Sequence, residues 1–378
     1  MRDKVIIRAC TVSMSVGFFI GLIPELKDMG YEVVTVSSDG PELSQVREAG
    51  GRPMVVEMER QISPFKDLVS LFKMIRIFRH EKPSMVHSMT PKAGLICMMA
   101  GMLTHVPVRV HTFTGLVFPT STGLKKRILM LTDMLTCACA THIIPEGEGV
   151  KNDLVNNGIT KKDIKVLGYG NCRGVDIVRF NPENPEFAEE AKKLRKDGVF
   201  TFIFIGRIVK DKGINELVEA FCRLYESRNI RLILVGPSED SLDPIFDSTK
   251  EKIRNCTGIE AVGIQQDVRP WLAASDALVF PSYREGFPNV VIEAGAMGLP
   301  SIVTDVNGSR EIIIEGENGI IIPPGDADTL YEAMNRMFED KTAREYMRSN
   351  ARRLVVTRYE QSFVRGCLKE FYNEILHA

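Results

Sequence analysis

Short apolar runs rich in β-branched side chains alternate with longer stretches of helical period along most of the chain. Helical stretches such as 64–80 and 123–135 separate the runs in the first half. Nearly continuous apolar strands separated by helices are typical of parallel sheets that are covered on both faces, and so of an α/β protein. We predict strands in the first half at 5–10, 32–36, 53–56, 85–88, 108–112 and 142–144, and in the second half at 200–205, 231–235, 277–280, 301–304 and 319–322.

A polar break divides the chain into two such series. Residues 181–186 read Asn-Pro-Glu-Asn-Pro-Glu and precede the charged stretch 189–197, as is typical of a domain boundary. We therefore predict two doubly wound, Rossmann-like domains, one at 1–182 and one at 183–360, followed by a helix at 361–378. In such sheets ligands bind beyond the carboxyl ends of the strands, and we expect them here in a cleft between the two domains.

The composition is that of a folded protein and excludes several classes. The 378 residues include 48 Lys and Arg against 49 Asp and Glu, and 44% of them are hydrophobic. These values exclude disordered, collagen-like and coiled-coil chains, and the net charge of −1 argues against a chain that coats nucleic acid. The eight cysteines lack the spacing of zinc ligands and fit reduced thiols. No signal-peptide pattern opens the chain and the longest apolar run, 93–103, is too short to span a bilayer, so we expect a soluble or peripheral protein.

The strongest chemical motif runs from Pro281 to Pro300 and reads P-S-Y-R-E-G-F-P-N-V-V-I-E-A-G-A-M-G-L-P. A predicted strand ends at its start, a tight loop carries Glu285, and a helix begins near Pro288. Backbone N–H groups at such a helix start form an anion site, and Glu293 lies inside the helix beside small residues. Two carboxylates so placed can accept hydrogen bonds from two points of one sugar ligand. The alternative for each glutamate alone is an ordinary surface or helix acid.

A second candidate site follows the first strand of the C-terminal half. Gly206 comes directly after the apolar strand 200–205 and lets the chain turn close to a ligand. Arg207 offers a planar fork for phosphate oxygens, and Lys212 adds a compact positive charge. Together they can neutralise a leaving diphosphate without a metal, and the alternative is a pair of solvated surface cations.

These two motifs resemble those of a known family. Residues 285–293 are similar to the Glu-seven-residues-Glu motif of retaining GT-B glycosyltransferases of family 4, and residues 204–213 resemble the G-R-x-x-x-x-K-G loop of that family. The likeness continues at 234–237, 263–268 and 307–311. It covers about 199–330 closely and the N-terminal half more loosely.

Within that family the chain is most similar to bacterial enzymes of capsule, O-antigen and N-glycan assembly, which extend sugars linked to polyprenyl diphosphate. This narrower likeness lies at 88–94, 109–115 and 170–176. The resemblance implies a GT-B fold in which the helix at 361–378 packs back on the N-terminal domain.

The resemblance also implies roles for the motif residues. Glu293 would hold the ribose and Glu285 the donor sugar, the nucleotide base would lie near Gly263, and no metal or other cofactor would be needed. The catalytic residues so implied are Arg207, Lys212 and Glu285. The donor-binding residues so implied are Gly206, Pro237, Gly263, Ile264, Gly286, Phe287, Pro288, Asn289, Val290 and Glu293.

The N-terminal half would supply the acceptor side. Ser15 lies in the loop 11–17 after the first strand, where a diphosphate can meet backbone amides. Lys92 follows another strand and either contacts the acceptor diphosphate or only caps the surface. The cleft histidine of the family falls on Thr114 here, whereas His111 stands three residues earlier, and a strand-end histidine is as readily a structural one.

From the resemblance we expect a retaining glycosyltransferase of the hexosyltransferase type. It would move a hexose or an N-acetylhexosamine from a UDP-sugar to a polyprenyl-diphosphate-linked saccharide in surface polysaccharide or glycan assembly. Two alternatives stay open. One is a nucleotide-sugar 2-epimerase or a transferase to a soluble acceptor, and the other, from a different class, is a non-catalytic subunit that binds nucleotide-sugars.

Charge is distributed unevenly along the chain. Residues 1–180 carry 23 Lys and Arg against 17 Asp and Glu, while the remainder carries 25 against 32. The segments 71–80 and 123–130 mix cations with large apolar side chains at helical spacing. Such helices can lie on an anionic leaflet, and the alternative is that their apolar faces pack on the sheet while the cations are solvated. We expect a cytoplasmic enzyme attached peripherally to the inner face of the cell membrane.

Other chemical motifs are weak. The sequence Asp326-Ala-Asp328 imitates the D-x-D metal motif of other sugar transferases, but it follows Pro-Pro-Gly and opens a predicted helix. Helix capping therefore explains it better than metal binding. No G-x-G-x-x-G follows the first strand, which argues against a dinucleotide-dependent oxidoreductase.

Overall fold

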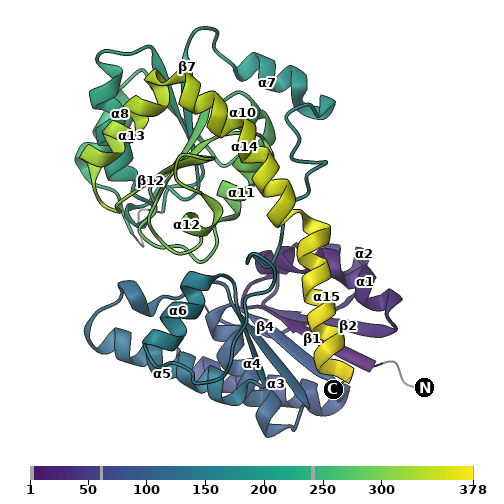
Figure 1. The fold of residues 1–378 in the computed structure, drawn as a ribbon. Coiled ribbons are helices and arrows are strands. Elements are labelled where there is room, and N and C mark those ends of the chain that lie inside the picture. Colours follow the sequence, from purple (N-terminus) through teal and green to yellow (C-terminus); the bar gives the residue numbers. More distant parts are fainter. Residues whose placement is uncertain (1–3, 60–62, 240–242, 378) are drawn as a thin grey trace. The chain divides into compact units, whose positions relative to one another are not determined.

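A computed structural model describes residues 4–59, 63–239 and 243–377 of the chain. The chain forms two compact units (Figure 1). The first unit comprises Met1–Arg173 together with Ser362–Ala378, and the second comprises Gly174–Gln361. Residues 174–182, which we placed in the N-terminal domain from the sequence, therefore belong with the second unit.

Within the described residues, the first unit contains a six-stranded parallel sheet in the order β3-β2-β1-β4-β5-β6. Its strands are β1 Lys4–Ala9, β2 Tyr31–Ser37, β3 Arg52–Val55, β4 Met85–Met89, β5 Val108–Phe113 and β6 His142–Pro145. They confirm the six strands predicted for the first half. The strand order reverses between β1 and β4, so the loops after these two strands diverge and leave room for a ligand, as in other doubly wound sheets.

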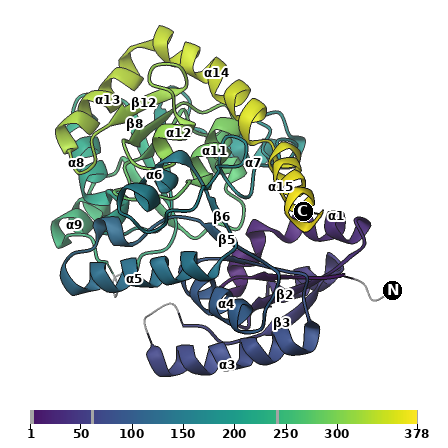
Figure 2. The same cartoon turned by 60° about the horizontal axis from the view of Figure 1, so that its bottom comes forward.

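Helices cover both faces of this sheet because successive strand residues point to opposite faces. Ile6 packs in one apolar cluster with Val33 and Tyr372, whereas Ile7 packs in another with Phe78 and other side chains of the opposite face. The long helices α3 and α5 both contact α4 (Figure 2). The helical elements are η1 Ser13–Phe18, η2 Ile20–Leu22, α1 Ile23–Asp28, α2 Leu43–Glu48, α3 Pro64–Glu81, α4 Pro91–Leu103, η3 Phe118–Thr120, α5 Gly123–Cys139, α6 Glu148–Asn156 and α15 Gln361–His377.

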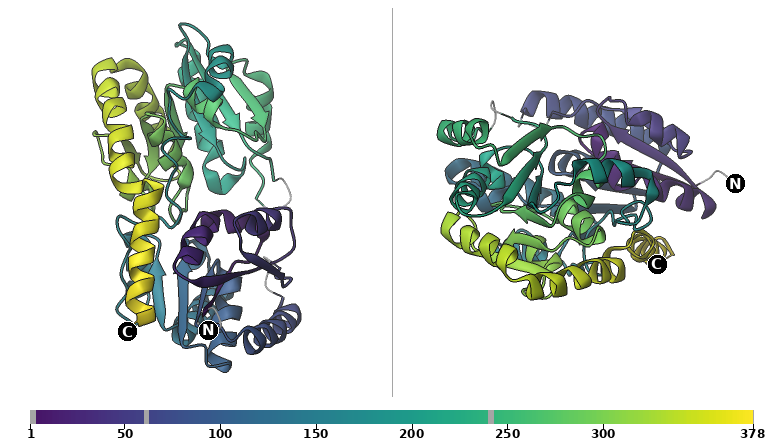
Figure 3. Two further views of the ribbon diagram at one scale, coloured as in Figure 1. Left: turned by 90° about the vertical axis from the view of Figure 1, so that its right-hand side faces the viewer. Right: turned by 90° about the horizontal axis from the view of Figure 1, so that it is seen from above.

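The C-terminal helix α15 is part of the first unit, as further views of the ribbon show (Figure 3). Tyr372 is fully buried there, and its hydroxyl contacts the guanidinium of Arg8 on β1. On the helix surface, Lys369 lies 2.6 Å from the Glu25 carboxylate of α1. The last residues of the chain are thus held on the strand and helix with which the chain begins.

The second unit contains, among the described residues, another six-stranded parallel sheet, in the order β12-β11-β10-β7-β8-β9. Its strands are β7 Phe200–Ile205, β8 Ile230–Val235, β9 Ile259–Gly263, β10 Ala277–Phe280, β11 Ser301–Thr304 and β12 Gly319–Ile322. Five of these strands were predicted, but β9 was not. It is an edge strand in which only Ile259 is buried, so it lacks the continuous apolar run by which buried strands are recognised.

The helices of the second unit cover both faces of its sheet. Asp326 caps α13, because its carboxylate accepts hydrogen bonds from the N–H groups of Asp328 and Thr329, both at 3.0 Å. The predicted capping role of this aspartate is confirmed. The helical elements are η4 Pro185–Phe187, α7 Ala188–Leu194, η5 Lys210–Lys212, α8 Ile214–Tyr225, α9 Asp247–Asn255, α10 Arg269–Ala273, α11 Asn289–Ala296, α12 Ser309–Ile312, α13 Ala327–Glu339 and α14 Lys341–Tyr359.

Candidate active site

Loops that follow β7, β8 and β10 meet at the carboxyl edge of the second sheet. Glycines permit the contact: a Cβ atom on Gly213 would lie 2.1 Å from the carbonyl oxygen of Pro281, and one on Gly236 would lie 1.9 Å from that of Gly206. Gly213 also has a φ of +70°, which side chains disfavour. Only glycine fits at these two points without a shift of the backbone, so these glycines permit the three loops to converge.

Lys212 and Glu285 form an ion pair where the loops after β7 and β10 touch. Their side chains are only 15% and 12% exposed. The ammonium group also lies 5.1 Å from the centre of the Phe280 ring. A partly desolvated pair interacts more strongly than one in water, so each group holds the other in a fixed position. The structure thus brings together two residues that lie 73 positions apart in the sequence.

The same two loops are joined by further polar contacts. The Tyr283 amide donates to the Asp211 carbonyl at 2.9 Å, and Arg284 lies 3.1 Å from the Asp211 carboxylate. Burial raises the pKa of the Tyr283 hydroxyl, and a hydrogen bond to Glu216 raises it further. These contacts fix the loop that carries Lys212 against the loop that carries Glu285.

Arg207 lies at the start of the loop after β7 and pairs with a different carboxylate from that of Lys212. Its guanidinium Nη1 lies 2.7 Å from a carboxylate oxygen of Glu239, which follows β8. The Arg207 side chain is 44% exposed and that of Glu239 is 28% exposed. No sequence motif marks Glu239, because its distance from Arg207 depends on how two loops meet.

Helix α11 begins just after Glu285. Pro288 precedes the first turn and has no side-chain oxygen with which to cap it. The chain before the helix is tightly held: a Cβ atom on Gly308 would lie 2.4 Å from the carbonyl oxygen of Gly286 and 2.6 Å from the Cα of Phe287. The first turn therefore presents its backbone N–H groups from a rigid position, as an anion site requires.

The remaining predicted residues of this segment lie on α11 itself. Asn289 and Val290 form the first turn, and both are partly buried. Glu293 is partly buried one turn later, where its main-chain carbonyl accepts a hydrogen bond from the Met297 amide at 3.1 Å. Gly295 lets α11 approach α14, since a Cβ atom there would lie 2.6 Å from a methyl carbon of Val355.

A pocket opens at the carboxyl ends of β8 and β9. The predicted donor residues Pro237, Gly263 and Ile264 all line it, so the structure brings these three together. Ile264 is 73% exposed and presents an apolar surface at the rim. Sequence reasoning missed the side of the pocket that α9 contributes, because that helix carries no motif. The lining residues on α9 are Lys250, Ile253 and Arg254, and Ile208, Ser238 and Ile245 are among those that line the pocket from loops.

Of the four predicted acceptor-side residues, His111 is buried on β5. Its Nδ1 lies 2.9 Å from the Ser88 hydroxyl, and its ring packs edge-on against Phe113 with 4.5 Å between ring centres. A Cβ atom on Gly94 of α4 would lie 2.3 Å from the imidazole. Burial lowers the pKa of His111 to about 3, so the ring is neutral at physiological pH and closed off by α4.

The other three acceptor-side residues lie in loops after strands of the first sheet. Ser15 is in η1, after β1, and Thr114 comes directly after β5; both are partly buried. Lys92 stands in the first turn of α4, after β4, and its ammonium lies 2.6 Å from the Asp67 carboxylate of α3. The loops after β1 and β4 are joined by a 2.7 Å hydrogen bond between the Thr11 and Thr90 hydroxyls.

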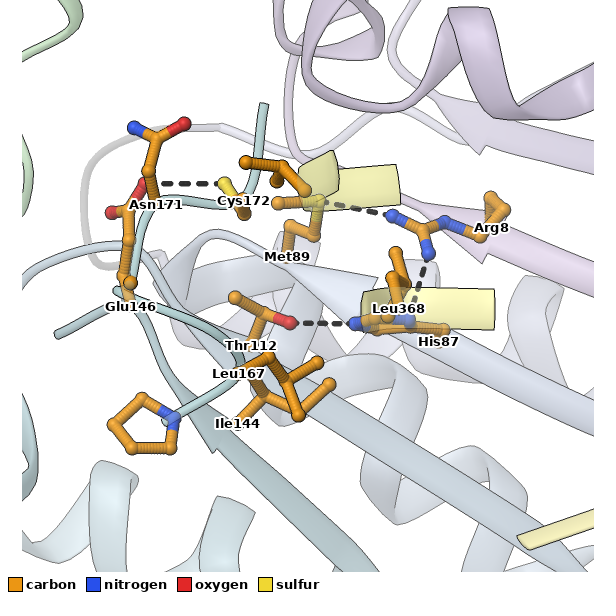
Figure 4. A pocket seen from close by; sticks show the side chains of 13 residues that line it. Arg8, His87, Met89, Thr112, Ile144, Glu146, Leu167, Asn171, Cys172 and Leu368 are labelled. Atoms are coloured by element: carbon orange, nitrogen blue, oxygen red, sulfur yellow. Dashed lines mark hydrogen bonds between the residues drawn. The ribbon is translucent and has the colours of Figure 1, made fainter. Parts of the chain in front are cut away.

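A second pocket lies in the first unit beneath α15 and was not predicted (Figure 4). Arg8 is 2% exposed, and its Nη1 lies 2.7 Å from Nδ1 of His87, whose Nε2 lies 2.6 Å from the Thr112 hydroxyl. On the other side of the pocket, the Cys172 thiol lies 3.1 Å from the Glu146 carboxylate. Burial lowers the pKa of His87 well below its ordinary value, and the nearby Arg8 charge lowers it further. The first two contacts link β1, β4 and β5, and the third links the end of β6 to the segment that carries Cys172.

No group of three or more His, Cys, Asp or Glu side chains within 4–59, 63–239 and 243–377 is arranged to hold a metal ion. Over the same residues, no helix is both long enough and apolar enough to cross a membrane.

Comparison with known proteins places these features among sugar transferases. Residues 186–354 match the family model of glycosyl transferases group 1, and residues 20–170 match that of the glycosyl transferase 4-like domain. The chain is 35% identical over 381 residues to the capsular polysaccharide biosynthesis glycosyltransferase CapM of Staphylococcus aureus, covering 100% of this chain and 98% of CapM.

Two further proteins show the range of this similarity. The UDP-Gal:alpha-D-GlcNAc-diphosphoundecaprenol alpha-1,3-galactosyltransferase of Escherichia coli is 28% identical over 305 residues, which is 79% of this chain and 77% of that enzyme. The crystal structure of Anabaena HepE in complex with UDP-glucose superposes with a TM-score of 0.82 at 17% identity, covering 98% of this chain and 99% of HepE.

Proposed function

The chain belongs to the glycosyltransferases of group 1 and has their GT-B fold, and from this premise we propose which transfer it catalyses. It moves a hexose or an N-acetylhexosamine from a UDP-sugar to a saccharide carried on a polyprenyl diphosphate, in the assembly of a surface polysaccharide. The configuration of the donor sugar is retained. The names of the S. aureus and E. coli relatives support the pathway class, the UDP-linked donor and the diphospholipid acceptor.

The observation that carries the proposal is the partly buried Lys212–Glu285 pair at the carboxyl edge of the second sheet. In the proposed reaction the glycosidic bond to the donor breaks and the leaving diphosphate gains negative charge. Lys212, Arg207 and the N–H groups of the first turn of α11 stabilise that charge. Preorganised charges of this kind, in a partly water-excluded site, supply the largest catalytic effect in many enzymes.

Glu285 accepts hydrogen bonds from hydroxyls of the donor sugar in this proposal. Its position four residues before α11 supports the role, because the sugar is attached to the phosphate that the helix start binds. Glu293 holds the ribose from within the helix. Gly263, Ile264 and Pro237 hold the base in the pocket that they line. Because two cations and a helix start already face the diphosphate, we propose that no metal ion is needed.

On the acceptor side we assign Ser15, Thr114 and Lys92, which lie in loops at the carboxyl ends of strands in the first sheet. Lys92 would exchange its partner Asp67 for the acceptor diphosphate. The buried neutral ring of His111 would instead support α4 from beneath.

We also propose peripheral attachment to the inner face of the cell membrane. The first half of α3 exposes Phe65, Leu68, Val69 and Phe72, with exposed fractions of 88%, 50%, 54% and 63%. Only the later apolar residues of this helix, such as Phe78, are buried. Apolar side chains next to lysines and arginines favour an anionic membrane surface, where the acceptor lipid resides.

The experiment that tests the function has two steps. Thermal shift and slow hydrolysis are first measured with a panel of UDP- and GDP-sugars, and the stabilising donor is then offered to polyprenyl-diphosphate-sugar acceptors. We expect stabilisation by one UDP-sugar and release of UDP with a lipid-linked acceptor, with the anomeric configuration of the product retained. Stabilisation without UDP release from any acceptor would indicate a binding subunit, and epimerised UDP-sugar without acceptor would indicate an epimerase.

A further inference from the structure

Each cation that the proposed function assigns to the donor diphosphate already has a carboxylate partner. Lys212 pairs with Glu285, and the Arg207 guanidinium lies 2.7 Å from Glu239. Glu285 is itself part of the proposed site. Glu239 has no such role, although it occupies one arm of the guanidinium fork with which arginine binds phosphate oxygens.

Glu239 is placed by the backbone around it. Two residues before Glu239, the Pro237 carbonyl accepts a hydrogen bond from the Ile208 amide at 2.8 Å. This bond joins the loop after β8 to the loop of Arg207. Four residues after Glu239, the Asp243 carboxylate accepts a hydrogen bond from the Asp211 amide at 2.6 Å. Because both flanks are tied to the Arg207 loop, the carboxylate of Glu239 is preorganised beside the guanidinium.

We propose that Glu239 is an internal counter-ion of the donor site. It holds Arg207 when the diphosphate is absent and competes with the diphosphate for the guanidinium when the donor or product binds. This proposal rests on the proposed function, since it requires that Arg207 binds the diphosphate. Its consequence is a site that keeps its cation in position between turnovers but binds UDP less tightly than the cation alone would, which favours product release.

The test is calorimetric titration of UDP into four proteins at low salt: wild type, Glu239→Gln, Arg207→Ala and the double variant. Glutamine keeps the size of the side chain and removes its charge. An exposed ion pair is weak, so we expect Glu239→Gln to tighten UDP binding by about two- to fivefold. The gain should shrink at high salt and vanish in the Arg207→Ala background. Glu339→Gln is the matched control, because Glu339 pairs with Arg228 in the same unit, at the opposite end of the sheet.

The outcomes separate this inference from the proposed function. If Arg207→Ala weakens UDP binding but Glu239→Gln leaves it unchanged or weaker, the counter-ion role alone is wrong. If Glu239→Gln tightens binding equally with and without Arg207, the effect is general charge repulsion and the inference is again wrong. If Arg207→Ala binds UDP as the wild type does, both the diphosphate role of Arg207 and the inference fail.

Discussion

Among single residues, Lys212 bears most directly on the proposed chemistry. We expect Lys212→Met to lower kcat by on the order of 100-fold or more, because one stabilising charge at the leaving diphosphate is lost while the apolar stem beside Phe280 is kept. Steady-state UDP release measures the effect, and circular dichroism checks that the variant is folded. Near-normal turnover would remove Lys212 from the mechanism.

A second residue, Asp133 on α5, gives a pH-dependent prediction for stability. Burial raises the pKa of its carboxyl from an ordinary value of 3.8 to about 7. The folded state therefore binds the proton more tightly than the unfolded state, so the free energy of unfolding falls as pH rises between those two values and is lowest above about 7. We expect Asp133→Asn to be more stable than the wild type at pH 8, by on the order of 1–3 kcal/mol, and little different at pH 4. Thermal melts across this range measure it, and a pH-independent difference would contradict the burial of a charge.

The sequence predicted those residues of the site that stand in a motif of their own. The sequence placed Lys212 and Glu285 each after a strand, and the structure joins them in one pair. It held no sign of Glu239 or of the α9 side of the pocket, because such neighbours depend on where loops meet. His111 likewise looked like a strand-end polar residue, and only the contact with Gly94 shows how α4 covers it.

At the level of elements, one buried hydroxyl links α15 to the sheet of the first unit. Tyr372 contacts both Arg8 and His87 inside the first unit. Removing the hydroxyl takes one hydrogen-bond partner from each of these two buried groups, so we expect Tyr372→Phe to lower the free energy of unfolding by about 1–3 kcal/mol. Asn373→Ala is the control, since Asn373 is the exposed neighbour on the same helix. Equal melting temperatures for the two variants would mean that the hydroxyl contributes nothing.

The strands show which elements can be predicted from the sequence. A central parallel strand is buried on both faces, and so β1, β7 and their neighbours appear as apolar runs. The edge strand β9 has exposed positions and was missed for that reason. Helix α3 is intermediate: its periodicity predicted a helix correctly, but only its later turns pack on the sheet while its first turns expose apolar side chains.

For the whole molecule, a net charge of −1 conceals two different halves. Residues 1–180 have an excess of Lys and Arg, and the remainder has an excess of Asp and Glu. The proposed membrane face lies on α3 and α5 in the basic half, whereas the proposed donor site lies in the acidic half and has its cations paired internally. An anionic surface would therefore attract one unit and repel the other, which orients the enzyme as it approaches.

This orientation predicts how membrane binding responds to mutation. The double variant Phe65→Ser/Phe72→Ser removes the two most exposed aromatic side chains of α3, and we expect binding to phosphatidylglycerol-containing vesicles to fall by about tenfold or more. Tyr346→Ser is the matched control, because Tyr346 is 57% exposed but lies on α14 in the second unit. Vesicle co-sedimentation at low and high salt measures both effects, and vesicles of phosphatidylcholine alone should bind weakly in every case. Since the double variant leaves the donor site unchanged, its UDP affinity should equal that of the wild type. Unchanged vesicle binding in the double variant would show that α3 does not face the membrane.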